Sequence, residues 1–270
     1  MAFSPVRELP RRRGFPFVPT IFLVVFLAFL TAGWLTSRLS TQPVALEQIT
    51  VAAAVEARTD AAASDFAEPP ASPLLQWGRF VLVGSDEWDA ATRQSLHEAL
   101  TVLPASVRSE LGNPSLGPLF VLVNTDGMTL SGRQPYGRGA NFYSTNEGRN
   151  ELVLYPGQSA GTALHELGHS YNLRRTPPGA YAQVFLDPEM LSFLKATGWR
   201  LLTPSNELRG LKDHTKVELS YTGAEIWTQL SRNDPLEDYA NSFALYFSAP
   251  EELRALSPAR YGWFDARFGP

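Results

Sequence analysis

Two histidines and a glutamate in the segment TALHELGHSYNL, residues 162–173, have the types and spacing that could bind a metal and hydrolyse a bond. His165 and His169 are four residues apart, so on a helix both imidazoles project from one face. That spacing lets two ring nitrogens share one tetrahedral zinc ion. Glu166 is rotated by about 100° from His165, so it would stand beside the metal without binding it. From there it could accept a proton from zinc-bound water, as a general base does.

The residues around these three favour a closely packed helix. Leu164, Leu167 and Tyr171 would anchor its opposite side. Gly168 costs about 1 kcal/mol relative to alanine inside a helix, so its presence predicts the close approach of another backbone. By chance, H-E-x-x-H arises in on the order of one chain in a hundred of this length. The apolar periodicity of this helix, which follows a predicted sheet, favours the zinc interpretation over coincidence.

A catalytic zinc ion usually takes three protein ligands and leaves one position for water. The chain has no cysteine and four histidines, so the third ligand must be a histidine or a carboxylate. The metzincin pattern would need a histidine at position 175, and Arg175 excludes it. Two options remain: His214, which is the only other downstream histidine, and a carboxylate on a later helix.

The segment NDPLEDYANSFALYF, residues 233–247, offers such a carboxylate. Asp234 is a good N-cap, and a proline follows at the first helical position. Glu237 then falls at N3, where it would either complete a capping box with Asp234 or reach the zinc. Asn241, one turn further on, could hydrogen-bond a ligating histidine. The stripe shared with Glu237 is small and polar and would permit close packing: Ala240, Asn241, Ala244 and Ser248.

The sequence H-E-L-G-H, followed by E-D-Y-A-N-S-F-A from position 237, resembles the gluzincin-type zinc metallopeptidases, in particular the catalytic domain of anthrax lethal factor and its bacterial relatives. The resemblance implies a zinc site with the ligands His165, His169 and Glu237. It further implies that Glu166 is the general base and that the substrate is a peptide or protein. Residues 139–145, GANFYST, are similar to the edge strand on which zincins bind an extended peptide by strand addition.

The chain departs from the pattern of these relatives at two positions. They often carry an oxyanion-stabilising tyrosine seven residues before the ligand glutamate, where this chain has Leu230. They also carry a second glutamate at the position of Asn241. Tyr221 and His214 are therefore the candidates for the oxyanion stabiliser, whereas Tyr239 is expected to point into the core.

The elements that must position these residues follow from apolar periodicity and turn signals. We predict strands at 79–84 and 119–124, a helix at 89–104 that Asp89 caps, a hairpin around the turn at 146–150, and a mainly helical part from about Pro188. Strands followed by helices indicate an α+β fold. With the resemblance, the prediction is a zincin-like domain that has a small mixed sheet, an H-E-x-x-H active-site helix and a mainly helical C-terminal part.

An uncharged apolar segment, residues 15–35, lies near the N-terminus. As a helix it would reach about 30 Å, the thickness of the hydrocarbon core of a bilayer. Core helices rarely show so long a run without a polar face. Arginines are more numerous before the segment than after it, so the positive-inside rule places the N-terminus in the cytoplasm and the following domain outside. A cleaved signal peptide, which would yield a secreted protein, is the alternative.

The predicted organisation is a cytoplasmic segment at 1–14, a transmembrane helix at 15–35, a flexible linker at 36–72 and the zincin-like domain at 73–270. The linker is rich in alanine, proline, serine and acidic residues and could bury little apolar surface. The net charge of −4 gives no basic excess, so nucleic acid is not an expected partner.

These features together predict a membrane-tethered zinc metallopeptidase. Its cofactor would be Zn²⁺, and it would cleave peptide bonds with a zinc-activated water and Glu166 as general base. The alternative is a catalytically weak or inactive zincin-like scaffold that binds a partner at the cell envelope. The leucine at position 230 favours the scaffold, whereas the intact Glu166 favours the enzyme. Hydrolysis of a non-peptide amide would use the same residues.

Overall fold

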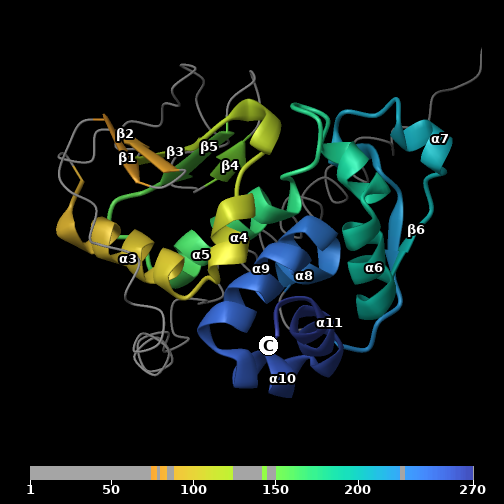
Figure 1. The fold of residues 1–270 in the computed structure, drawn as a ribbon. Coiled ribbons are helices and arrows are strands. Elements are labelled where there is room, and N and C mark those ends of the chain that lie inside the picture. Colours follow the sequence, from red (N-terminus) through yellow and green to blue (C-terminus); the bar gives the residue numbers. More distant parts are fainter. Residues whose placement is uncertain are drawn as a thin grey trace, which may run out of the picture. The chain divides into compact units, whose positions relative to one another are not determined.

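The computed structural model describes residues 74–77, 80–83, 88–123, 142–144, 150–225 and 229–269, all within the compact unit of residues 50–270 (Figure 1). The fold mixes helices with two small sheets, which agrees with the predicted α+β class. The predicted cytoplasmic segment, membrane helix and linker lie outside the described residues. Among the residues that are described, no helix combines the length and apolar composition needed to span a bilayer.

A five-stranded mixed sheet forms the first part of the domain, in the order β1-β2-β3-β5-β4. Its strands are β1 (Leu74–Trp77), β2 (Phe80–Val83), β3 (Leu119–Val123), β4 (Phe142–Ser144) and β5 (Asn150–Leu154). The central pairs β2–β3 and β3–β5 are parallel, and the outer pairs β1–β2 and β4–β5 are antiparallel. The predicted strands and the hairpin are confirmed, and β4 lies at the edge of this sheet.

Helical elements connect the parallel strands β2 and β3, and a further helix follows β5 and contacts β4 and β5. They are α3 (Ala90–Thr101), α4 (Ala105–Glu110), the 3₁₀ turn η3 (Pro114–Leu116) and α5 (Ala160–Asn172). Asp89 caps α3 as predicted, because its side chain accepts the Thr92 backbone N–H at 2.8 Å. Helix α3 packs against α5, so the β2–α3–β3 unit supports the helix that carries the histidines.

The second part of the domain is mainly helical, as predicted. Its elements are η5 (Tyr181–Leu186), α6 (Pro188–Thr197), β6 (Trp199–Leu201), α7 (Ser205–Leu208), η6 (His214–Lys216), β7 (Leu219–Tyr221), α8 (Gln229–Asn233), α9 (Pro235–Ser248), α10 (Pro250–Leu256) and α11 (Pro258–Phe268). The antiparallel pair β6–β7 was not predicted, because strands of three residues are too short to show an alternating pattern.

Helix α9 is the centre of this second part. It packs against α5, α8, α10 and α11. All of its residues are buried except Glu237. Tyr239 is fully buried, which confirms that it belongs to the core. Because α9 is enclosed on nearly every side, its backbone is held in one position. The Cα atom of Glu237, the one residue of α9 that is partly exposed, is therefore held in a fixed place.

Candidate metal centre

Helix α5 forms where the sequence predicts it. Ser159 is the N-cap, and its hydroxyl accepts the backbone N–H of Thr162 at 3.2 Å. Leu164, Leu167 and Tyr171 are buried, as expected for the side of the helix that anchors it. The histidines occupy a different stripe and keep part of their side chains accessible, 18% for His165 and 14% for His169.

Gly168 allows α5 and α9 to lie in close contact. A β-carbon added at this position would be 3.0 Å from the Cα atom of Ala240 and 3.2 Å from its carbonyl oxygen. These are backbone atoms, so a larger residue would push the two helices apart. The predicted approach of another backbone at Gly168 is confirmed, and that backbone belongs to the helix that carries Glu237.

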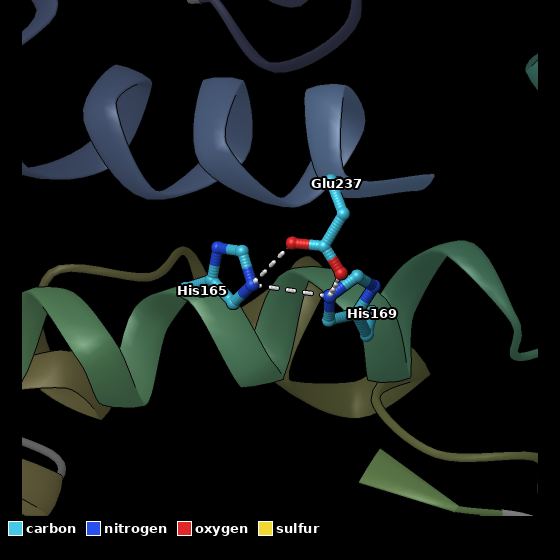
Figure 2. A group of neighbouring side chains, drawn as sticks. All are labelled: His165, His169 and Glu237. Atoms are coloured by element: carbon cyan, nitrogen blue, oxygen red, sulfur yellow. Dashed lines mark hydrogen bonds and ion pairs between the residues drawn. The ribbon is translucent and has the colours of Figure 1, made fainter. Parts of the chain in front are cut away.

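The two helices bring together the three residues that the sequence singles out as metal ligands. Figure 2 shows Glu237 reaching from α9 toward His165 and His169 on α5. Its Oε2 atom lies 3.4 Å from Nε2 of His165, and its Oε1 atom lies 3.4 Å from Nε2 of His169. The two Nε2 atoms are 3.1 Å apart. One ligand atom from each residue falls within 4.8 Å of the others, a spacing that could hold one metal ion.

The carboxylate of Glu237 had a competing role as a helix cap. Asp234 does cap α9, since its Oδ1 atom accepts the backbone N–H of Leu236 at 2.8 Å. Glu237 instead extends to the two imidazoles, 31% exposed. Of the two interpretations that the sequence left open, the structure therefore shows this side chain in the histidine group.

Asn241 makes the hydrogen bond that was predicted for it. Its Oδ1 atom lies 2.9 Å from Nδ1 of His165, and its amide group donates to the Ser231 hydroxyl at 3.1 Å. An amide oxygen can only accept, so this bond requires Nδ1 of His165 to donate, which leaves Nε2 as the nitrogen through which the ring would bind a metal. This tautomer presents the ligating nitrogen toward His169 and Glu237. Ser231, ten residues before Asn241 on α8, belongs to no motif that sequence reasoning could detect.

The pKa values of the histidine group show that its surroundings stabilise positive charge. Burial lowers the pKa of His169, but hydrogen bonding to Glu237 and the charges of Glu237, Glu166 and Asp234 outweigh it and raise that pKa to about 9. Burial raises the pKa of Glu237, but hydrogen bonds with His165 and His169 lower it well below its usual range. The negative charge of the carboxylate stabilises a proton bound by the imidazoles. The same charge would stabilise a metal cation that replaces the proton.

Glu166 is nine-tenths buried beside this group. Burial raises the pKa of its carboxyl above the usual range, and the charge of Glu237 acts in the same direction, whereas His165 and His169 oppose it. A carboxylate with a raised pKa binds a proton more readily. The residue predicted to act as a base therefore lies in an environment that strengthens its basicity.

The two candidates for the oxyanion stabiliser lie in different surroundings. His214 has its Nε2 atom 3.4 Å from Oδ2 of Asp234, the N-cap of α9, and interacts electrostatically with His169. The hydrogen bond with Asp234 raises the pKa of His214. Tyr221 instead bonds through its hydroxyl to the backbone of Glu225 and to Arg260, on another side of α9. His214 therefore interacts electrostatically with the histidine group, whereas the hydroxyl of Tyr221 contacts Arg260.

Leu230, at the position where the gluzincins that the motif resembles often carry a tyrosine, lies in α8. No protein-family model matches the chain, and no curated protein is significantly similar to it in sequence. The site is therefore interpreted from its own geometry and chemistry.

Proposed function

We propose that the protein is a zinc metallopeptidase of the gluzincin type, tethered to a membrane by residues 15–35 with its domain outside the cytoplasm. The observation that carries the proposal is the convergence of His165, His169 and Glu237 from two packed helices. Two imidazoles and a carboxylate are a ligand set that catalytic zinc takes in proteins, and it leaves a position for water.

The donor atoms of this chain fit a zinc ion. Asn241 fixes the tautomer of His165 whose Nε2 atom is free to bind a metal. When bound, zinc would lower the pKa of a water molecule and polarise the scissile carbonyl. The remaining chemistry falls to the chain itself. Glu166 would take the proton of that water and pass it to the leaving amine, and its burial, which raises the pKa of its carboxyl, favours acceptance of the proton.

Two further features of the domain support a peptide substrate. The edge strand β4 contacts α5 and pairs on one side with β5, so its other edge could receive an extended peptide by strand addition. His214, held by Asp234, would supply a positive group for the charge that develops on the carbonyl oxygen. This assignment replaces the tyrosine of the relatives, whose position is occupied here by Leu230.

The proposal is tested on the full-length protein purified in detergent. We expect one zinc ion per chain and cleavage of members of a peptide library, with cleavage lost and zinc kept in Glu166→Gln. Stoichiometric zinc without cleavage across the library would support the scaffold instead. Absence of zinc binding at micromolar concentrations would contradict both the enzyme and the zinc-containing scaffold.

A further inference from the structure

The residue next to Glu237 belongs to a second, fully buried cluster. Asp238 and Arg260 have side chains 0% and 1% exposed. They form two parallel hydrogen bonds, from Nε to Oδ1 and from Nη2 to Oδ2, both 2.7 Å long. Trp199 also donates to Oδ2 at 2.8 Å. This cluster joins α9 to α11 and to strand β6.

Arg260 is held at every donor. Its Nη1 atom donates to the carbonyl oxygen of Glu225 at 3.2 Å and to the hydroxyl of Ser257 at 3.0 Å. Its Nη2 atom also donates to the hydroxyl of Tyr221 at 3.4 Å. With the two bonds to Asp238, each of the five N–H groups of the guanidinium has an acceptor. A planar cation held in this way fixes the orientation of the carboxylate opposite it.

Net stability is a poor explanation for such a pair. Removing two charges from water costs about as much as their attraction returns, so well-packed apolar side chains would often serve the fold equally well. In attested cases, buried polar groups instead select one arrangement among several. The arrangement that such a pair would select here is the rotation of α9 about its own axis at its first turn.

That rotation determines where Glu237 points. Neighbouring side chains on a helix are about 100° apart, so when Asp238 is fixed toward α11, Glu237 must project toward α5. Glu237 is also the only residue of α9 that is not buried, so packing around its own side chain constrains it least. Packing of the other α9 residues fixes where this side chain begins, and the two hydrogen bonds of Asp238 add a directional constraint to the same turn.

We propose that Asp238 and Arg260 form an orientation clamp, a pair of positioning residues that hold Glu237 toward His165 and His169. The clamp acts through the first turn of α9 and touches neither the metal nor the substrate. Its consequence for metal binding rests on the proposed zinc function, whereas its effect on the position of Glu237 does not.

The test replaces the clamp with apolar side chains, Asp238→Val together with Arg260→Met, in the full-length protein. Removing both charges avoids leaving Asp238 or Arg260 buried without its partner. The Glu225 carboxylate, which lies 3.6 Å from Arg260 and is 30% exposed, keeps its hydrogen bond from Ser257. Arg260→Lys is the second variant, because it keeps the positive charge and loses the two parallel hydrogen bonds that the guanidinium donates. Val121→Ala is the control, since it removes buried atoms from strand β3 and leaves the first turn of α9 intact. Denaturant midpoints establish that each protein is folded.

Two readouts decide the proposal. One is zinc affinity, measured by competition with a chelator, and the other is the distance from Glu237 to the histidines in a metal-free crystal structure. The clamp predicts affinity weaker by about tenfold or more in the apolar pair and in Arg260→Lys, as for other residues that orient metal ligands. It also predicts separations well beyond the 3.4 Å of the unaltered protein. The control should keep both values.

A Glu237 side chain that stays at its original distances in the apolar pair would overturn the clamp, whatever the zinc affinity. If the apolar pair does not fold, Arg260→Lys carries the same two readouts. If the unaltered protein bound no zinc, the proposed function would fail, and the metal-free position of Glu237 would still decide the clamp.

Discussion

Glu237 and Asp238 are adjacent carboxylates at the start of one helix, and their surroundings differ completely. Asp238 is fully enclosed and pairs with the guanidinium of Arg260 and the indole of Trp199. Glu237 is about one-third exposed and faces the Nε2 atoms of two imidazoles. Asp238 pairs with a permanently charged guanidinium, whereas Glu237 faces two imidazoles that can bind either a proton or a metal ion.

Helical position, and not residue type, assigns the two roles. About 100° of rotation turns one carboxylate toward α11 and the other toward α5. Asp238 accepts from Arg260, Trp199 and Ser242, so its oxygens have little capacity left for a metal. Glu237 keeps that capacity.

Removing either histidine should cause the largest change, because it dismantles the group that Glu237 faces. We expect His165→Ala and His169→Ala to lose zinc well beyond the roughly 10–100-fold weakening that follows loss of an orienting neighbour. Metal content after dialysis, measured by emission spectroscopy on folded protein, checks this. His97→Ala, on α3, is the matched control and should keep its zinc. Equal metal content in all three variants would contradict the site.

Glu166→Gln should separate catalysis from metal binding. The amide keeps the shape of the side chain and loses the ability to accept a proton. We expect turnover of a cleaved peptide to fall by about 10²–10⁴-fold, the range for loss of a general base. Zinc affinity should stay near that of the unaltered protein. Turnover that survives the substitution would remove Glu166 from the mechanism.

Gly168→Ala should disturb the contact that carries Glu237 to the histidines. The added methyl group would meet the Ala240 backbone at 3.0 Å, so α9 must shift. Overpacking of about 1–3 kcal/mol should exceed the gain of about 1 kcal/mol from helix propensity, which leaves a net loss of stability of up to about 2 kcal/mol. Zinc should also bind more weakly.

Gly262→Ala is the control for that experiment. Gly262 lies inside α11, and an added β-carbon would meet nothing within 4 Å. Alanine there should raise the free energy of unfolding by about 0.5–1 kcal/mol. Urea denaturation measures both variants, and similar changes in the two would show that α5 and α9 are not in close contact in solution.

The smallest expected effect concerns Asp234, whose carboxylate pairs with the titratable side chain of His214. Asp238 differs, because its partner is a permanently charged arginine. The hydrogen bond with Asp234 raises the pKa of His214, and the charge of Asp213 adds to this, whereas burial and the charge of His169 oppose it. Since the pKa is raised in the folded protein, the stabilisation is complete below the unfolded value of about 6.5. It is lost as the pH rises through the folded value.

His214→Gln should therefore cost more stability at pH 5.5 than at pH 9. The two side chains are about 30% exposed, so the difference should be at most about 1 kcal/mol. Thermal or urea unfolding at the two pH values measures it. A larger cost at pH 9 would mean that the neutral imidazole, and not the imidazolium, makes the contact.

Much of the site was predictable, because its signals are local. The spacing of His165 and His169 fixes a shared helical face. Gly168 predicted a close helix contact, and the stripe of Glu237 and Asn241 predicted which side of α9 would make that contact. Each of these inferences depends only on helical periodicity, which is the strongest signal in a single sequence. The metal itself, the reaction and the membrane anchor remain predictions.

The clamp and the second sheet were not predictable in the same way. Arg260 follows Asp238 by 22 residues and lies on another helix, so no spacing rule connects them. Trp199 and Tyr221 face each other across β6 and β7, strands too short to give a pattern. The sequence does not reveal that Tyr221 lies in a strand opposite Trp199, so it left Tyr221 as a candidate for the oxyanion stabiliser. Its hydroxyl contacts Arg260, so it belongs to the clamp's surroundings.

Zinc affinity distinguishes Glu237 from Asp238 as the carboxylate proposed to complete the metal site. The measurement is competition with a chelator on Glu237→Ala and on the double variant Asp238→Val with Arg260→Met, each shown to be folded by its denaturation curve. We predict that Glu237→Ala loses far more than a hundredfold in affinity, whereas the double variant still binds one zinc ion with a loss of about tenfold. A Glu237→Ala protein that keeps its zinc would contradict the account, and if both variants kept it, His214 would become the third ligand to test.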